Sequence, residues 1–434
     1  LLKKDAETGK PLEGVVFGLY AQEDIKNAAG EVVVEKDALI ELGTTDEEGK
    51  LVFQADLPHG KYYIQEVEHK PGYLPNDEVY SFDASYTDQT LELLAFSEEI
   101  SNQPTITEFT KVDLTGGQEI EGAKMQILDQ DGKVVEEWVS KKEPHVVYAL
   151  EPGEYVLHEE QAPTEQGYVR AEDVKFVVEE TGDVQKVKME DDHTKVSISK
   201  TDITDGKEIE GAKLQILNQD GEVVESWTTG EEHLIEYLPI GTYTLHEEAA
   251  VDGYIVANDV EFTVEETGEI QKVKMEDERA MGQLVIVKTD TDSKTALEGV
   301  EFVLLEKETG EEVGRLKTGK DGKAVSELLP IGTYENGVFK EPITYVLKET
   351  ATLKGYEKTE EEWEIVFTYQ NDKTPVIEVV KEIQNKKIPE TPGTVKPGPK
   401  TGDDTNWFLP LLALGVSAGM VAGLLYYRKR HKKA

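Results

Sequence analysis

Four sets of polar side chains stand where a β-strand would normally carry apolar ones. In the segment VSISK, Val196, Ile198 and Lys200 share one face because side chains alternate along a strand. By the same alternation, Glu247 and Asp277 each end an apolar stripe on another strand. The pattern occurs in four segments, in the sets Lys3, Glu66 and Asn102; Lys111, Glu159 and Asp191; Lys200, Glu247 and Asp277; and Lys288, Glu349 and Asn385. Each set places an amine, a glutamate carboxyl group and a second side-chain carbonyl on core-facing positions.

These groups have a specific chemistry if they are buried together. A buried unpaired charge costs several kcal/mol, so the groups must pair, neutralise or react. Desolvation lowers the pKa of a lysine and raises that of a carboxyl group, which leaves a neutral, nucleophilic amine. The amine could attack the Asn or Asp carbonyl while the Glu proton polarises it and moves to the leaving ammonia or water. A single Lys or Glu at a strand end is ordinarily solvated, but four coincident sets favour an amide that joins two strands.

The segments that carry these sets are copies of one unit. Residues 119–138 and 208–227 agree at 16 of 20 positions, and a looser version of the same pattern begins at Lys3, Lys111, Lys200 and Lys288. Short alternating runs are separated by Asp-Gly, Gly-Lys and Pro-Gly turns, and no long helical period occurs before Trp407. The sequence therefore predicts an all-β protein of tandem, antiparallel, immunoglobulin-like sandwiches. We expect the sandwiches at 1–103, 104–193, 194–279 and 280–387.

The C-terminal part has a different composition. Residues 388–406 are rich in proline and predict a disordered linker. Residues 407–427 carry no formal charge and match the roughly 20 residues that a membrane-spanning helix needs. A basic stop-transfer tail, 428–434, follows with Arg428, Lys429, Arg430, Lys432 and Lys433, which predicts that the acidic body lies outside the cell. Because no signal peptide precedes Leu1, we expect an N-terminally truncated fragment whose first unit lacks the start of its lysine strand.

Composition excludes several classes of function. The formal net charge of −43 repels nucleic acid. The absence of cysteine excludes disulfides and thiol catalysis, and no His-Glu-x-x-His motif occurs. We therefore expect no metal, no cofactor and no enzymatic activity toward an external substrate.

The C-terminal arrangement resembles the cell-wall sorting signal of Gram-positive surface proteins. The matching residues are Pro399, Lys400, Thr401 and Gly402, followed by the apolar span and the basic tail. The resemblance implies that a sortase transiently binds the chain, cuts between Thr401 and Gly402, and joins Thr401 covalently to peptidoglycan. Gly398 stands where this family usually has Leu, which leaves the sortase class open. The expected location is extracellular and wall-anchored, with the C-terminal segment in the plasma membrane before sorting; a retained single-span anchor is the alternative.

The repeats resemble the B-type, or prealbumin-like, repeats of Gram-positive collagen adhesins and pilins. The shared features are Lys-x-Asp, a Gly-x-Tyr strand ending in Glu, a downstream Gly-Tyr, and a terminal Asn or Asp. The resemblance implies intramolecular isopeptide bonds from Lys3 to Asn102, Lys111 to Asp191, Lys200 to Asp277 and Lys288 to Asn385, assisted by Glu66, Glu159, Glu247 and Glu349. The family's Ala-Pro-x-Gly-Tyr survives only in part, since Val251 replaces the proline of the third unit.

These observations favour the stalk of a wall-anchored adhesin or surface protein, projecting a missing N-terminal region through which any host-matrix ligand would bind. A tip or basal pilus subunit is an alternative, whereas the absence of a Tyr-Pro-Lys pilin motif disfavours a polymerising shaft. A third alternative is the C-terminal stalk of a surface enzyme whose catalytic domain is missing.

Overall fold

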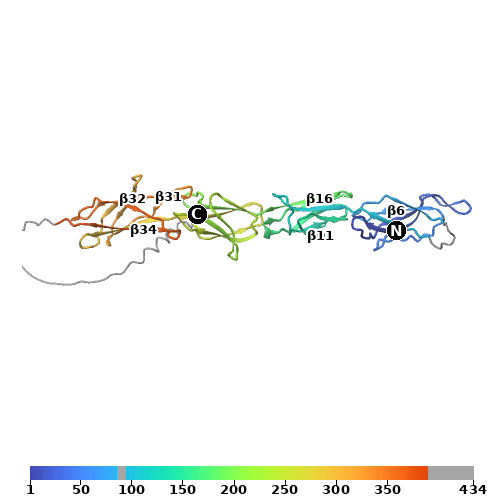
Figure 1. Cartoon of the computed structure of the whole chain (residues 1–434), viewed down its shortest axis with the longest axis horizontal. Coiled ribbons are helices and arrows are strands. Elements are labelled where there is room, and N and C mark those ends of the chain that lie inside the picture. Colours follow the sequence, from blue (N-terminus) through green and yellow to red (C-terminus); the bar gives the residue numbers. More distant parts are fainter. Residues whose placement is uncertain (86–93, 390–434) are drawn as a thin grey trace, which may run out of the picture. The chain divides into compact units, whose positions relative to one another are not determined.

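The computed structural model describes residues 1–85 and 94–389. These residues form β-strands, turns and one short 3-10 helix, with no α-helix among them (Figure 1). The strands form successive pairs of sheets, so the predicted tandem β-sandwiches are confirmed. The predicted linker from residue 390 onward, the hydrophobic segment 407–427 and the basic tail lie outside the described residues. Within the described ranges, no helix is long and apolar enough to span a membrane.

The second sandwich shows the common plan. One sheet has the order β11 (Val134–Val139), β10 (Lys124–Leu128), β13 (Gly153–Gln161), β15 (Val174–Val178). The other has the order β12 (His145–Tyr148), β9 (Ile106–Asp113), β16 (Val184–His193), β14 (Tyr168–Val169), and η1 (Thr164–Gln166) precedes β14. Alternate residues of these strands, among them Phe109, Ile127 and Leu157, are buried in one core. Burial of each such side chain contributes about 1.5–3 kcal/mol.

The third sandwich repeats this plan strand for strand. Its sheets have the orders β19 (Val223–Thr228), β18 (Lys213–Leu217), β21 (Gly241–Ala249), β23 (Val260–Val264) and β20 (His233–Glu236), β17 (Lys195–Asp202), β24 (Ile270–Arg279), β22 (Tyr254–Ile255). Equivalent positions, such as Ile198, Ile216 and Leu245, again fill the core. The likeness of residues 119–138 and 208–227 in sequence is thus accompanied by the same strand order throughout the unit.

The first and fourth sandwiches are variations. The first has a four-stranded sheet, β5 (Leu39–Thr44), β2 (Val16–Ala21), β6 (Lys61–Glu68), β7 (Val79–Asp83), the pair β1 (Leu2–Asp5) and β8 (Glu99–Asn102), and a hairpin, β3 (Ile25–Lys26) and β4 (Val32–Val34). The fourth has a sheet β27 (Glu312–Lys317), β26 (Glu301–Glu306), β32 (Thr344–Ala351), β33 (Glu362–Val366). Its second sheet contains β28 (Lys323–Val325), β25 (Met281–Asp290), β29 (Leu329–Pro330) and β34 (Val376–Asn385), and it adds a hairpin, β30 (Gly332–Glu335) and β31 (Val338–Pro342).

One feature departs from the antiparallel sandwich that the sequence predicts. In every sandwich the first and last strands are parallel neighbours, in the pairs β1 with β8, β9 with β16, β17 with β24 and β25 with β34. Alternation has the same period in parallel and antiparallel strands, so the sequence pattern does not carry strand direction. In the second sandwich, Lys111 lies opposite Met189, two residues before Asp191. The lysine and the terminal aspartate therefore point from adjacent strands into the same core.

Candidate crosslink sites

The structure brings together all three members of each predicted set. The lysine comes from the first strand, the glutamate from a central strand of the facing sheet, and the Asn or Asp from the last strand. The four lysine side chains are at most 4% exposed and the four glutamate side chains at most 3%. The terminal residues, Asn102, Asp191, Asp277 and Asn385, are at most 2% exposed. Four amines and their partners are thus removed from water in the interior of four separate sandwiches.

The contacts within the sets are nearly identical. The distance from lysine Nζ to glutamate Oε2 is 2.9 Å for Lys3, Lys111 and Lys288, and 3.0 Å for Lys200. Each lysine Nζ also donates a hydrogen bond to Oδ1 of the terminal residue, in the pairs Lys3 with Asn102, Lys111 with Asp191, Lys200 with Asp277 and Lys288 with Asn385. The amine nitrogen therefore lies next to the carbonyl group that it would attack.

The two sandwiches that end in Asn carry a further hydrogen bond to the glutamate. Asn102 Nδ2 donates to Glu66 Oε1 at 2.8 Å, and Asn385 Nδ2 donates to Glu349 Oε1 at 2.6 Å. Because one glutamate oxygen contacts the amine and the other contacts the amide nitrogen, the carboxyl group bridges the nucleophile and the leaving group. This is the geometry that a proton shuttle requires.

In the two sandwiches that end in Asp, the terminal carboxyl group must carry a proton to contact the glutamate as the Asn amide does. Burial raises the pKa of Asp191 and of Asp277 to about 7, Lys111 and Lys200 oppose the rise, and Glu159 and Glu247 add to it. Asp191 Oδ2 and Glu159 Oε1 are buried and have no hydrogen-bond partner among the described residues. A proton on the aspartate would take the position of the Asn amide hydrogen and make it a neutral acceptor.

Burial also makes two of the lysines easier to deprotonate. Desolvation lowers the pKa of Lys3 and of Lys288, although Glu66 and Glu349 oppose the shift. This desolvation favours the neutral amine, which is the nucleophilic form. The amine nitrogens also lie 5.4 Å from the ring centre of Phe17 and 5.7 Å from that of Phe302, and such ring contacts favour the charged form.

A repeated β-bulge directly follows the glutamate, which faces the core by regular alternation with the apolar residue two positions earlier. In the second sandwich, Met125 pairs with Glu159 and Lys124 with Gln161, so Glu160 is an extra residue in β13. The same register shift occurs at the glutamate of the other three sandwiches. Bulges are common beside functional sites, and this one shifts the pairing of the residues that follow the glutamate. The alternation of the sequence did not reveal this bulge, and the doubled acid in His-Glu-Glu at 158–160 and 246–248 was its only local signal.

A second buried aspartate lies two residues after each lysine, and its role was not anticipated. These residues are Asp5, Asp113, Asp202 and Asp290. Asp113 accepts backbone N–H groups of Thr115 and Gly116 at 2.7 and 2.6 Å, which closes the turn after β9. Burial raises the pKa of Asp113, but such hydrogen bonds more than offset this effect. The pKa of Asp113 is therefore lowered, whereas that of Asp191 is raised. The opposite shifts distinguish a turn-capping, ionised aspartate from a neutral acceptor; the recurring Lys-x-Asp was the available signal.

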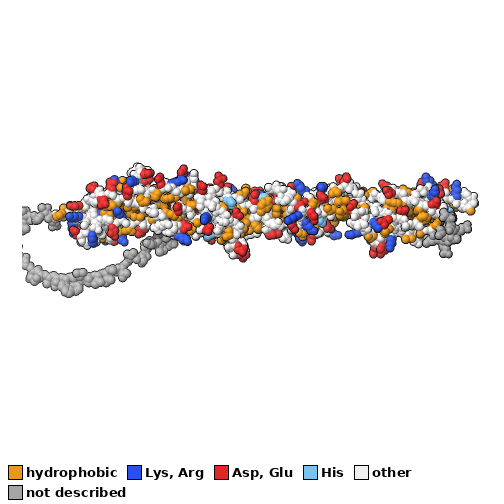
Figure 2. Space-filling view, in the orientation of Figure 1, with side chains coloured by type: hydrophobic (Ala, Val, Ile, Leu, Met, Phe, Trp, Pro, Cys, Tyr) orange, Lys and Arg blue, Asp and Glu red, His pale blue; other side chains and the backbone are white. Residues whose placement is uncertain are grey.

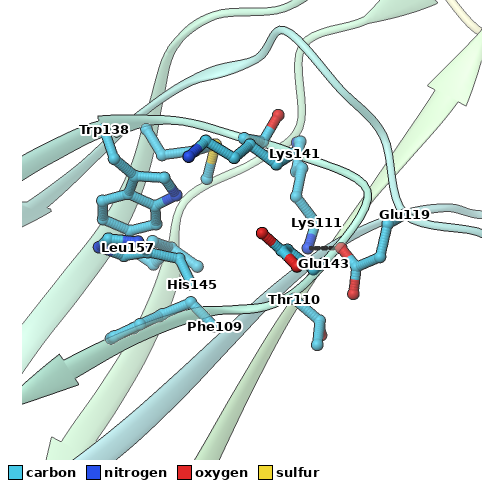
Figure 3. Close-up of a pocket in the computed structure, with 11 residues that line it drawn as sticks. Phe109, Thr110, Lys111, Glu119, Trp138, Lys141, Glu143, His145 and Leu157 are labelled. Atoms are coloured by element: carbon cyan, nitrogen blue, oxygen red, sulfur yellow. Dashed lines mark hydrogen bonds between the residues drawn. The ribbon is translucent and has the colours of Figure 1, made fainter.

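An aromatic pair covers the lysine strand in the second and third sandwiches. Figure 3 shows the pocket beside Lys111, where Trp138 stacks on His145 with ring centres 4.3 Å apart. Trp227 and His233 stack in the same way at 4.5 Å. The dashed line in Figure 3 joins Lys111 to Glu119, which accepts its backbone N–H at 3.0 Å. The pocket is a hollow at the edge of the core, lined by both the ring pair and Lys111.

Comparison with solved structures finds several similar chains. The Bacillus anthracis TIE protein is 22% identical, with 89% of this chain and 73% of that chain covered and a TM-score of 0.47. A streptococcal ancillary pilin is 16% identical, with 66% and 99% covered and a TM-score of 0.28. A variant of BcpA, the major pilin subunit of Bacillus cereus, is 17% identical, with 65% and 99% covered and a TM-score of 0.34. Likenesses at this level do not identify a function, and no curated protein matches the chain.

A family model covers most of the sequence. The model for SpaA, the prealbumin-like fold domain, matches residues 1–96, 105–193, 194–279 and 282–383. Each match corresponds to one of the sandwiches described above. The chain therefore belongs to the SpaA prealbumin-like fold family, of which it carries four domains in tandem.

Proposed function

We propose that this chain is a stalk of a cell-surface protein whose four sandwiches are each locked by a self-formed isopeptide bond. The observation that carries the proposal is the set of four buried lysines, each in contact with both a glutamate and a side-chain carbonyl. A buried ion pair alone is weak support for stability, since its desolvation offsets its attraction. Four copies of the same arrangement fit a reaction better than four unreacted pairs.

The reaction balances with the groups present. Lysine Nζ attacks Cγ of the Asn or Asp, and a new C–N bond forms. The bond from Cγ to the leaving group breaks, which releases ammonia from Asn102 and Asn385 and water from Asp191 and Asp277. The glutamate accepts a proton from the amine and delivers one to the leaving group. No cofactor or external reactant takes part.

The mass of the intact protein tests the proposal. For a recombinant chain of residues 1–406, each Asn closure should remove about 17 Da and each Asp closure about 18 Da, a deficit of about 70 Da in all. Digestion and peptide mapping should then recover four crosslinked pairs, including Lys111 with Asp191. A mass equal to that of the sequence would overturn the proposal.

The two kinds of acceptor residue, Asp and Asn, predict different pH dependences for the rate of bond formation. Because the pKa of Asp277 is raised to about 7, its neutral, reactive form is lost as the pH rises through that value. The fraction of Asp277 in that form falls about tenfold for each pH unit above it, so the Lys200–Asp277 closure should slow relative to the Lys288–Asn385 closure as the pH rises. Asn385 does not titrate, and the lowered pKa of Lys288 favours its closure as the pH rises. Cell-free synthesis on either side of pH 7, with early peptide mapping, measures both bonds in one chain; parallel pH profiles would contradict the assignment.

The same proposal includes attachment to the cell wall. Its support is the order of Pro399–Gly402, the apolar segment and the basic tail in the sequence. A sortase would be the transient partner, and peptidoglycan would be joined at Thr401. Figure 2 shows acidic and basic side chains interspersed over the visible face of the described residues, a surface suited to a spacer. A host ligand, a pilus partner or a surface enzyme would then belong to whatever this stalk carries.

A further inference from the structure

The Gly-Tyr pair that follows each glutamate strand has a feature that the crosslinks do not use. The four glycines, Gly72, Gly167, Gly253 and Gly355, all have φ between 80° and 90°. The first three are buried, whereas Gly355 is exposed. Their backbone conformation is the same, so the burial of the first three must come from something that packs against them.

The next sandwich in the chain buries these glycines. A Cβ atom on Gly72 would come within 3.0 Å of the backbone of Ala149, and one on Gly167 within 3.0 Å of the backbone of Tyr237. A Cβ on Gly253 would meet Tyr334 and Phe339 at 2.8 Å. All four neighbours belong to the following domain. The equivalent atom on Gly355 would meet nothing within 4 Å.

Backbone hydrogen bonds join the same places. The carbonyl oxygen of each buried glycine accepts an N–H from the start of the next sandwich, in the pairs Thr105 to Gly72 at 2.9 Å, Thr194 to Gly167 at 2.9 Å and Ala280 to Gly253 at 2.8 Å. Thr194 O in turn accepts the N–H of Tyr237 at 3.0 Å, and Thr105 O accepts that of Ala149 at 2.9 Å. The glycine, the incoming strand and the packing loop thus form one hydrogen-bonded unit.

Side chains reinforce two of the junctions. At the second, Tyr237 has a φ of 60°, its hydroxyl donates to Asp113 at 2.8 Å, and its ring stacks on His193 with centres 3.9 Å apart. At the third, Arg279 lies 4.2 Å from the ring centre of Tyr334, whose hydroxyl donates to Gly253 O at 2.8 Å. A left-handed conformation is unfavourable for a tyrosine and persists only where the surroundings impose it.

We propose that the Gly-Tyr turn is a socket in which each sandwich holds the next one, so that the motif fixes the orientation of successive domains. The partner is the amino-terminal edge of a second domain of the same fold. Glycine is required because any side chain would displace the packing loop. This inference is independent of the crosslinks, which act within a sandwich rather than between two.

Distance measurement between spin labels tests the socket in the full chain. The protein has no cysteine, so Lys175→Cys and Glu261→Cys place labels only on exposed positions of β15 and β23. In this background Gly167→Ala should broaden the distance distribution roughly twofold, toward the mobility that is the default for linked domains. Gly355→Ala is the matched control, because it has the same positive φ but no neighbour to displace. It should leave the distribution unchanged.

Each outcome of the distance measurement either supports or overturns the proposed packing between domains. A narrow distribution in a folded Gly167→Ala protein would overturn the socket, as would equal broadening by Gly355→Ala. If Gly167→Ala fails to fold, Tyr237→Ala tests the same junction from the other side and must broaden the distribution for the proposal to stand. The mass deficit of the crosslinks should be the same in all these variants, so a failure of the socket cannot be mistaken for a failure of the crosslink proposal.

Discussion

Replacing Glu159 by Gln is expected to leave the second sandwich without its Lys111–Asp191 bond. The substitution keeps the shape of the side chain but removes the group that takes the proton from the amine. The protein should be about 17 Da heavier than the parent, because the retained water adds about 18 Da and the substitution itself removes about 1 Da. By analogy with a disulfide that closes a loop of the 80-residue separation between these residues, the sandwich should lose about 4.5 kcal/mol of stability. Calorimetry should show its melting temperature lowered on the order of 20 °C.

The neighbouring Glu160 provides the matched control. It is the extra residue of the bulge, its side chain is 45% exposed, and it pairs with Lys124 at the surface. Exposed ion pairs contribute about 0–1 kcal/mol, so Glu160→Gln should keep the mass deficit and nearly all of the stability. A Glu159→Gln protein that still lacks one water would show that the glutamate is not the proton shuttle. Asp191→Ala, which removes the acceptor instead, should match Glu159→Gln in the loss of the bond.

The second large effect concerns extension under force. In the crosslinked third sandwich, tension passes from Lys200 directly to Asp277, and the 77 residue steps between them are not stretched. Lys200→Met should remove this bond, so that the residues between the two positions can be extended by the force. Single-molecule pulling should then show one additional unfolding step of about 270 Å, at roughly 3.5 Å per residue. The parent chain should reach its full extension without that step.

An exposed lysine serves as the control for this experiment. Lys207→Met alters a side chain that is 59% exposed, close to the same strand, and should leave the extension of the parent unchanged. Asp277→Ala should reproduce the added step by removing the other end of the bond. A step of the same length in the parent chain would mean that the third sandwich carries no crosslink.

The sequence pattern predicted the strands and the inward faces well because both depend on local alternation. Lys200 was expected to point inward from the parity of Val196 and Ile198, and its side chain is buried. Likewise, the recurrence of one unit was sufficient to predict four sandwiches. These properties follow from residue types a few positions apart, which a single sequence displays.

Properties that depend on the pairing of distant strands were not predictable in this way. The bulge at Glu159 is defined by its register against Met125, and the parallel neighbours β9 and β16 meet only after the chain has folded. The packing of Tyr237 on Gly167 joins two domains, and the sequence around either residue does not indicate that it contacts the other. Strand direction, register and inter-domain packing are therefore properties of the fold rather than of any one segment.

The parallel pairing of the first and last strands determines how a sandwich resists tension before any bond has formed. The chain enters at the beginning of one strand and leaves at the end of its parallel neighbour, so pulling slides the two strands along each other. In this shear geometry all the hydrogen bonds of the ladder are strained together, whereas peeling would break them singly. The ladder has eight residue pairs in the second and third sandwiches and ten in the fourth. We therefore expect the two strands of the fourth sandwich, which is nearest the proposed wall anchor in the sequence, to slide apart at a higher force than those of the second and third.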